Sequence, residues 1–233
     1  MEGNQSEKIL IIGFGEGTKN IIAQIKSKNY PGVQAFDFDS YDIFPEELYQ
    51  MVILINPSPK DLNSLSKSFY QAGVLTLVIS SKDFSTIDNC FDSFTKVPQS
   101  KILPTISGIL EPLFHFGPIS FDFNDISSTL KESGKFTIKT YQCNTSKNKI
   151  DEIVKNLKKD LVNLDIVKNR TFIINYNPSS NLPLTVDELI PLQTFFTSLP
   201  ENINIKWGVQ FDDSLDSNEL QLSLIASGKV MKI

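Results

Sequence analysis

The stretch KILIIGFGEGTKNIIAQIKSK, residues 8–28, decides the fold of the N-terminal half. It opens with four apolar β-formers, a pattern typical of a strand buried on both of its faces. Three glycines within five residues come next, and three isoleucines at helical spacing follow them. A buried strand, a glycine-rich turn and an amphipathic helix make the first half of a βαβ unit, which predicts a parallel sheet. The glycines are Gly13, Gly15 and Gly17.

The same alternation of strand and helix continues as far as residue 81. Prolines in NPSPKD stop the third strand, and Gly73 closes the helix that follows it. This order predicts a doubly wound, Rossmann-like parallel sheet with flanking helices. The expected strands are 9–12, 33–40, 51–55 and 74–81, with a helix over 62–73.

The C-terminal half has another pattern, with four strands and three helices that predict an α+β domain. We place the boundary so that residues 1–117 form the first domain and residues 118–233 the second. The last two strands, with DDSLDSN between them, are interpreted as a hairpin. Pro191 is expected to interrupt the third helix. The strands are 135–142, 170–177, 202–211 and 219–228, and the helices 126–133, 147–164 and 185–199.

Composition limits the function. The net charge of −5 gives no electrostatic footprint for nucleic acid, so no nucleic-acid partner is expected. The two cysteines are far apart and out of metal spacing, and a single histidine, His115, cannot build a histidine metal site, so we expect no metal. No apolar run is long enough to span a bilayer and the start is polar, which predicts a cytoplasmic protein without direct membrane insertion.

The glycine turn allows two interpretations from its residues alone. Glycines at a helix N-terminus suit an anion, and a dinucleotide turn would place Asp37 or Asp39 on a ribose. The spacing departs from G-x-G-x-x-G, because the third glycine comes one residue early and Thr18 stands in its place. The other interpretation is a tight strand-to-helix turn that needs glycine for its geometry alone.

A series of segments resembles the FtsZ branch of the tubulin superfamily, in one consistent order over about residues 8–230. GFGEGTKN is similar to that family's first phosphate loop, and AFDFDS to its I-N-T-D segment. AGVLTLVISSKDF and LIASG resemble two of its strands. The resemblance implies a two-domain FtsZ/tubulin-like architecture. It also implies that the vestigial phosphate site consists of Gly13, Gly15, Gly17, Asn20 and Asp39.

GPISFDFNDISSTL resembles the family's catalytic loop, N-x-D-x-x-D, which in FtsZ acts on the nucleotide of the neighbouring subunit. Ser120, Asp122 and Asp125 occupy the three positions, so both carboxylates are present and the Asn is not. Without the resemblance, Asp125 is interpreted as a helix cap and Asp122 as a strand-end residue. These are the candidate catalytic residues, and they are not expected to suffice without a nucleotide within reach.

Departures from the family bear on nucleotide binding. NPSPKDLNSL stands where the resemblance implies the glycine-rich signature loop, and proline lacks the N–H that a phosphate would need. Only YDIFPEELYQ joins the second and third strands, where the family has a further phosphate loop. Gln99, Ser100 and Lys101 replace Asn, Asp and Arg, and Pro112 is expected to interrupt the helix that lines the family's guanine pocket. We therefore expect neither GTP nor GDP as a cofactor.

The resemblance with these losses predicts a noncatalytic FtsZ-like protein that acts through protein contacts in a cytoskeletal or cell-division context. Its expected partner is an FtsZ-like subunit or a second copy of itself. Two alternatives stay open: a structural protein that assembles without nucleotide, and a weak GTPase completed by a partner subunit. The family's membrane-tethering tail has no counterpart before residue 233, so recruitment by that route is not expected.

Overall fold

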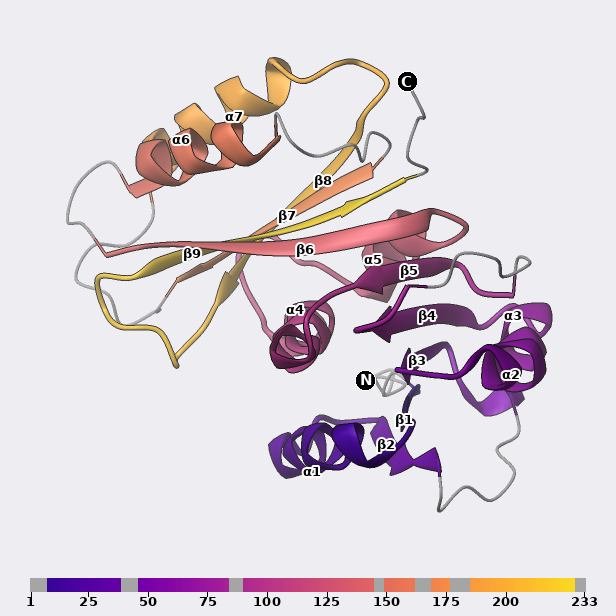
Figure 1. Cartoon of the computed structure of the whole chain (residues 1–233). Coiled ribbons are helices and arrows are strands. Elements are labelled where there is room, and N and C mark those ends of the chain that lie inside the picture. Colours follow the sequence, from indigo (N-terminus) through magenta and orange to yellow (C-terminus); the bar gives the residue numbers. More distant parts are fainter. Residues whose placement is uncertain are drawn as a thin grey trace, which may run out of the picture. The chain divides into compact units, whose positions relative to one another are not determined.

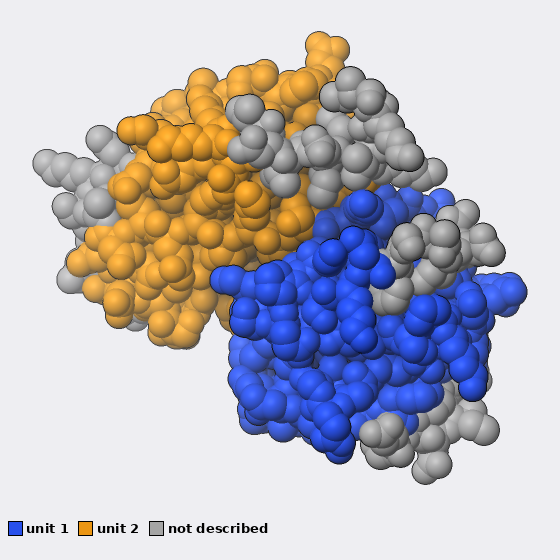
Figure 2. Space-filling model, in the orientation of Figure 1, with its two compact units in different colours: residues 1–107, 130–136 blue, residues 108–129, 137–233 orange. Residues whose placement is uncertain are grey.

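The computed structural model describes residues 8–38, 46–83, 90–144, 149–161, 169–176 and 185–228. The chain forms two compact units (Figure 2). Unit 1 comprises Met1–Ser107 and Leu130–Phe136, and unit 2 comprises Gly108–Thr129 and Thr137–Ile233. The domain boundary expected at residues 117/118 stays a prediction, because a compact unit is not by itself an independently folding domain.

Unit 1 contains the predicted parallel sheet. Its strands lie in the order β2-β1-β3-β4-β5-β6, and every neighbouring pair is parallel. Every residue of β1, β3 and β4 is buried, as their continuous apolar sequences predict. Strand β5 was not predicted from the sequence, because three of its four residues are polar. The bounds are β1 Ile9–Gly13, β2 Val33–Asp37, β3 Met51–Ile55, β4 Leu75–Ser80 and β5 Ser93–Lys96. The sixth strand of this sheet is the first part of β6, which spans Gly134–Cys143.

Helices flank this sheet (Figure 1). Helix α1, Lys19–Lys28, follows a 3-10 turn, Glu16–Thr18, and buries the three predicted isoleucines. Gly13 lets α1 approach β1, because a Cβ there would come within 2.7 Å of Thr18 Oγ1. Helix α2, Pro59–Asp61, continues through a π-helical turn, Leu62–Ser66, into α3, Lys67–Gln71. Short 3-10 turns lie at Glu46–Leu48 and Gln99–Lys101.

A buried aspartate ties distant segments of unit 1 together. Asp92 is 2% exposed, and its carboxylate accepts N–H bonds from Thr76 at 2.8 Å and Glu132 at 3.0 Å. Burial raises the pKa of the Asp92 carboxyl above its usual range. Its carbonyl oxygen also accepts the N–H of Gly134, so the segment beginning at Leu130 is part of this unit.

Unit 2 has the strand order β6-β9-β7-β8. Strand β7, Asn169–Tyr176, pairs in parallel with β8, Asn204–Phe211, and antiparallel with β9, Leu220–Ser227. The hairpin predicted from β8 and β9 is therefore wrong, because β7 lies between these two strands. The described residues contain nine strands, most of them paired in parallel, and the predicted α/β fold is confirmed.

Helices α6, Lys149–Leu161, and α7, Ile190–Thr197, lie side by side over one face of the unit 2 strands (Figure 1). Pro191 stands in the first turn of α7, which follows a 3-10 turn at Asp187–Leu189, so it starts that helix instead of interrupting it. The core under the two helices includes Ile153, Leu157, Phe172, Ile174, Leu192, Phe195, Leu222 and Leu224.

Helix α4, Ile102–Phe114, begins in unit 1 and ends in unit 2. Pro112 does not interrupt it, contrary to the sequence expectation, and the N–H of His115 still reaches Glu111 O at 3.1 Å. Pro112 lies two residues before the last residue of α4, so it removes only one of the last helical hydrogen bonds. In the part of the chain that the structure describes, no helix is both long and apolar enough to cross a membrane.

Candidate functional site

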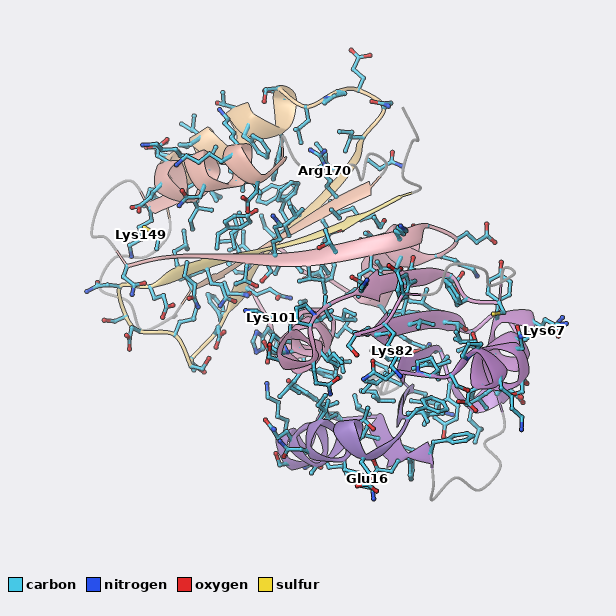
Figure 3. All side chains as sticks on the ribbon, viewed as in Figure 1. Glu16, Lys67, Lys82, Lys101, Lys149 and Arg170 are labelled. Atoms are coloured by element: carbon cyan, nitrogen blue, oxygen red, sulfur yellow. The ribbon has the colours of Figure 1, made fainter. Side chains whose placement is uncertain are left out.

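The predicted phosphate loop lies at the carboxyl end of β1. Gly15 has a φ of 79°, and Thr18 Oγ1 donates to Gly15 O at 2.7 Å, so the turn closes on itself before α1. Glu16 stands in this turn with its side chain exposed and pairs with Lys19 at 2.6 Å (Figure 3). A carboxylate at the helix start opposes a phosphate there. The structure thus places Gly13, Gly15, Gly17 and Asn20 together, whereas Asp39 lies outside the described residues.

The start of α2 is capped by its own side chains. Asp61 Oδ2 accepts from the Ser58 N–H at 3.0 Å and from Ser58 Oγ at 2.6 Å, and the Asp61 N–H reaches Ser58 Oγ at 3.3 Å. This capping box satisfies the backbone N–H groups of Ser58 and Asp61. An internal carboxylate therefore occupies the helix start at which the resemblance implied a phosphate loop.

A polar strap crosses the loops at the carboxyl edge of the unit 1 sheet. Gln99 Nε2 donates to Gly17 O at 2.8 Å, and Gln99 Oε1 accepts from Asn56 Nδ2 at 3.0 Å. Asn56, with a φ of 54°, in turn accepts the Ser81 N–H at 2.8 Å. The strap thus joins the loops after β1, β3, β4 and β5, and its polar groups are bound within the chain.

The loop before α5, Phe123–Leu130, is held against β8 in unit 2. The Phe211 N–H donates to Phe116 O at 2.7 Å, and Ile119 and Val209 exchange backbone hydrogen bonds at 3.3 and 3.1 Å. Gly117 lies so close to β8 that a Cβ there would be 2.0 Å from Val209 O. These contacts fix the loop that carries the candidate catalytic residues.

Asp122 and Asp125 cap α5 together. The Asp125 N–H donates to Asp122 Oδ1 and the Asp122 N–H to Asp125 Oδ2, both at 3.1 Å. The expectation that Asp125 precedes the helix and that Asp122 ends a strand is wrong, because α5 starts at residue 123 instead of 126. Asp122 is the N-cap, and Asp125 is the third helical residue, whose carboxylate accepts a backbone N–H as expected. Ser120, the third predicted residue, is exposed in the same loop.

Lys206 completes this cluster and was not predicted from the sequence. Its Nζ donates to Asp125 Oδ1 at 2.9 Å and to Ser128 Oγ at 2.6 Å. The side chains of Lys206 and Asp125 are 36% and 31% exposed, so water screens their attraction only in part. Lys206 lies 81 residues from Asp125 in the sequence, and no motif or spacing links them.

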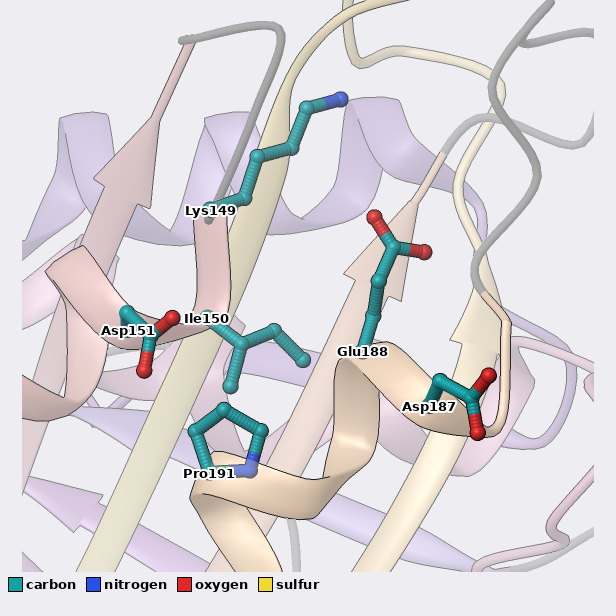
Figure 4. Close-up of a pocket in the computed structure, with 6 residues that line it drawn as sticks. All are labelled: Lys149, Ile150, Asp151, Asp187, Glu188 and Pro191. Carbon is teal, nitrogen blue, oxygen red and sulfur yellow. The ribbon is translucent and has the colours of Figure 1, made fainter.

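Two other features of unit 2 are weaker candidates. A pocket of about 190 Å³ lies between the first residues of α6 and the turn before α7, and Figure 4 shows its lining. It holds three carboxylates and one lysine, and Glu188 already accepts hydrogen bonds from Thr185.

Burial lowers the pKa of Arg170, the single arginine, in β7 (Figure 3). Among the described residues no group of three His, Cys, Asp or Glu side chains is placed to hold a metal ion.

The curated relatives that match this chain in sequence are named as cell division proteins FtsZ. No protein-family model matches the chain. The cell division protein FtsZ of Methanothermobacter thermautotrophicus is 25% identical over 199 residues, which covers 70% of this chain and 52% of the relative. The chain spans about half, or less, of the length of the curated relatives it matches.

Solved structures share the fold. An empty FtsZ dimer from M. jannaschii has a TM-score of 0.71 at 16% identity, covering 96% of this chain and 89% of that one. A GDP-bound monomer of CetZ1 from Haloferax volcanii has a TM-score of 0.64 at 9% identity, covering 96% of this chain and 95% of that one. At 16% and 9% identity these likenesses show a shared fold, and the likeness in sequence comes from the curated relatives.

Proposed function

This chain is a divergent member of the FtsZ and tubulin superfamily, and we propose that it works through protein contacts without hydrolysing GTP. Its setting is the cytoskeletal and cell-division context of its relatives. The partner is an FtsZ-like subunit or a second copy of this chain, and the location is the cytoplasm. This proposal concerns this chain alone and makes no statement about the activity of its relatives.

The capped start of α2 carries the proposal. A bound triphosphate needs free N–H donors and a positive local potential. Here the Asp61 carboxylate accepts the Ser58 N–H and adds a negative charge, and Ser58 Oγ accepts the Asp61 N–H. Gln99 ties Gly17 to Asn56 across the neighbouring loops. Both features favour a unit 1 whose loops bind one another and do not bind a nucleotide.

The loop in unit 2 supports the second half of the proposal, a surface able to dock. It keeps both aspartates, is fixed to β8, and presents Phe116 with 82% of its surface exposed. A rigid loop with an exposed aromatic residue suits binding, because little conformational entropy is lost on docking. We therefore assign the partner contact to the loop from Phe116 to Asp125.

Cosedimentation with the Methanothermobacter FtsZ and GTP tests the proposal. We expect the chain to pellet with the polymer or to change the amount of polymer. Phe116→Ser should lower the bound fraction several-fold, since exposed aromatic residues are frequent anchors. Leu48→Ser is the matched control, because Leu48 is an exposed apolar residue of unit 1, 44% exposed. Neither binding nor an altered polymer with the unchanged chain would contradict the proposed function.

A further inference from the structure

Arg170 stands at a position of β7 whose neighbours are apolar. In the strand register it lies between Ala226 of β9 and Ile205 of β8, and both pack in the core under α6 and α7. The other residues of β7 on this face belong to the same core: Phe172, Ile174 and Tyr176. The alternation of the strand therefore places a charged side chain on the core side of the sheet, in the first row of an apolar face (Figure 3).

The guanidinium of Arg170 has no counter-charge among the described residues. Arg170 is 6% exposed, and its buried Nε has no hydrogen-bond partner in the part of the chain that the structure describes. Burial lowers its pKa, and no carboxylate of the described residues counteracts this effect. A buried charge without a partner is costly, because nothing replaces the water that it has lost.

Packing alone does not explain an arginine at this position. Its aliphatic stem can cover apolar neighbours, but a methionine or a leucine would do so without burying a charge. The cost is offset when an anion from outside the described residues supplies the missing charge. The small exposed fraction of Arg170 lets such an ion reach the guanidinium without unfolding of the core.

We propose that Arg170 is a binding site for a small oxyanion, with the guanidinium N–H groups as donors and its positive charge as the counter-charge. A guanidinium presents five N–H donors in a planar fork, which matches two oxygens of a phosphate or of a carboxylate. Helix α5 lies against the other face of β7, where Thr129 and Thr171 share a hydrogen bond of 2.8 Å. The site is therefore separate from the loop that precedes α5, and it does not depend on the proposed partner contact.

Thermal unfolding in sodium phosphate and in sodium chloride of equal ionic strength tests the proposal. Phosphate at ten times its dissociation constant should lower the unfolding equilibrium constant about 11-fold, because it binds only the folded chain. We expect the midpoint of the unchanged chain to rise by about 3–6 °C and then to level off. Arg170→Met should melt at least as high as the unchanged chain in chloride, since it removes an unpaired buried charge, and should show no saturable rise in phosphate.

Two further variants separate binding from a general salt effect. Phosphate also stabilises proteins because it is excluded from their surface, and this effect is common to all variants. Lys158→Met is the matched control, because it removes a positive charge from an exposed position of α6 and should keep the full phosphate response. Arg170→Lys keeps the charge without the planar fork, so it should keep only a part of that response.

Acetate in place of phosphate distinguishes the two kinds of oxyanion. A saturable rise with acetate alone identifies a carboxylate as the ligand, and a rise with phosphate alone identifies a phosphate group. Both results support the site, provided that Arg170→Met abolishes the rise.

Two outcomes overturn the proposal. The first is an equal response of the unchanged chain and Arg170→Met, which assigns the rise to general salt effects. The second is no saturable rise of the unchanged chain with either anion. Should Arg170→Met not fold, Arg170→Gln takes its place as the variant without the charge. All these measurements use the chain without a partner, so neither outcome bears on the proposed function.

Discussion

Gly117 and Gly208 show how single residues set the approach of the loop to β8. A Cβ on Gly117 would lie 2.0 Å from Val209 O, and one on Gly208 would lie 3.3 Å from Ile119 O. Glycine at 117 is therefore needed for space, and this need arises from a strand more than 90 residues later in the sequence. From the sequence, Gly117 could be interpreted only as part of a Gly-Pro turn.

Replacing Gly117 with alanine should lower the free energy of unfolding by about 1–3 kcal/mol, the usual cost of inserting a methyl group into a packed contact. Urea denaturation followed by circular dichroism measures the change. Gly17→Ala is the control, because its nearest neighbour would be Gln99 Nε2 at 3.7 Å, and it should change stability by less than about 0.5 kcal/mol. A Gly117→Ala chain as stable as the unchanged chain would show that the loop can move off β8.

Helix α5 illustrates what local sequence can and cannot tell. The two aspartates three residues apart predicted a helix start, and the structure has one, but the division of roles between them depends on the mutual capping of both side chains. Local patterns likewise placed β1, β3 and β4. They failed for the pairing of β8 and β9, because strand neighbours far apart in the sequence leave no local signal, and for β5, whose Ser93 and Thr95 obscure the apolar pattern.

The capping role of Asp122 predicts an asymmetry between two substitutions. Asp122→Ala should cost about 0.5–2 kcal/mol of stability, whereas Asp122→Asn should cost a few tenths, since asparagine caps helices as well as aspartate does. Urea denaturation of both variants, compared with the unchanged chain, gives the two values. Equal losses for alanine and asparagine would mean that the charge of Asp122, and not its hydrogen bond to the Asp125 N–H, stabilises α5.

At the scale of the whole molecule, the fold is shared with the solved FtsZ and CetZ structures, and the loops at the carboxyl edge of the unit 1 sheet are joined by their own polar side chains. The buried strands at the carboxyl edge of unit 1 could be predicted from the sequence, because their apolar runs are continuous. The strap from Gly17 through Gln99 to Asn56 could not, because its members come from three separate loops. The sequence predicts where the loops depart from the family pattern, and the structure shows which side chains of these loops bind one another.

Isothermal titration of the chain with GTP and with GDP should show no saturable heat. We expect any dissociation constant to exceed about 1 mM, a binding free energy weaker than about 4 kcal/mol. CetZ1 from Haloferax volcanii, whose solved structure holds GDP, is the positive control. Binding in the micromolar range would contradict the loss of the nucleotide site, and Gln99→Ala would then show whether the strap opens to admit the ligand.

The path of the chain makes it hard to express the two units as separate fragments. Residues 130–136 belong to unit 1 although they follow a segment of unit 2. A fragment ending at residue 117 would lose the Glu132 N–H that Asp92 accepts and the strand β6 that pairs with β5. The exposed edge of β5 would then invite intermolecular pairing and aggregation. A fragment of unit 1, whether made in the laboratory or by recombination in evolution, must therefore include residues 130–136 or have a redesigned β5.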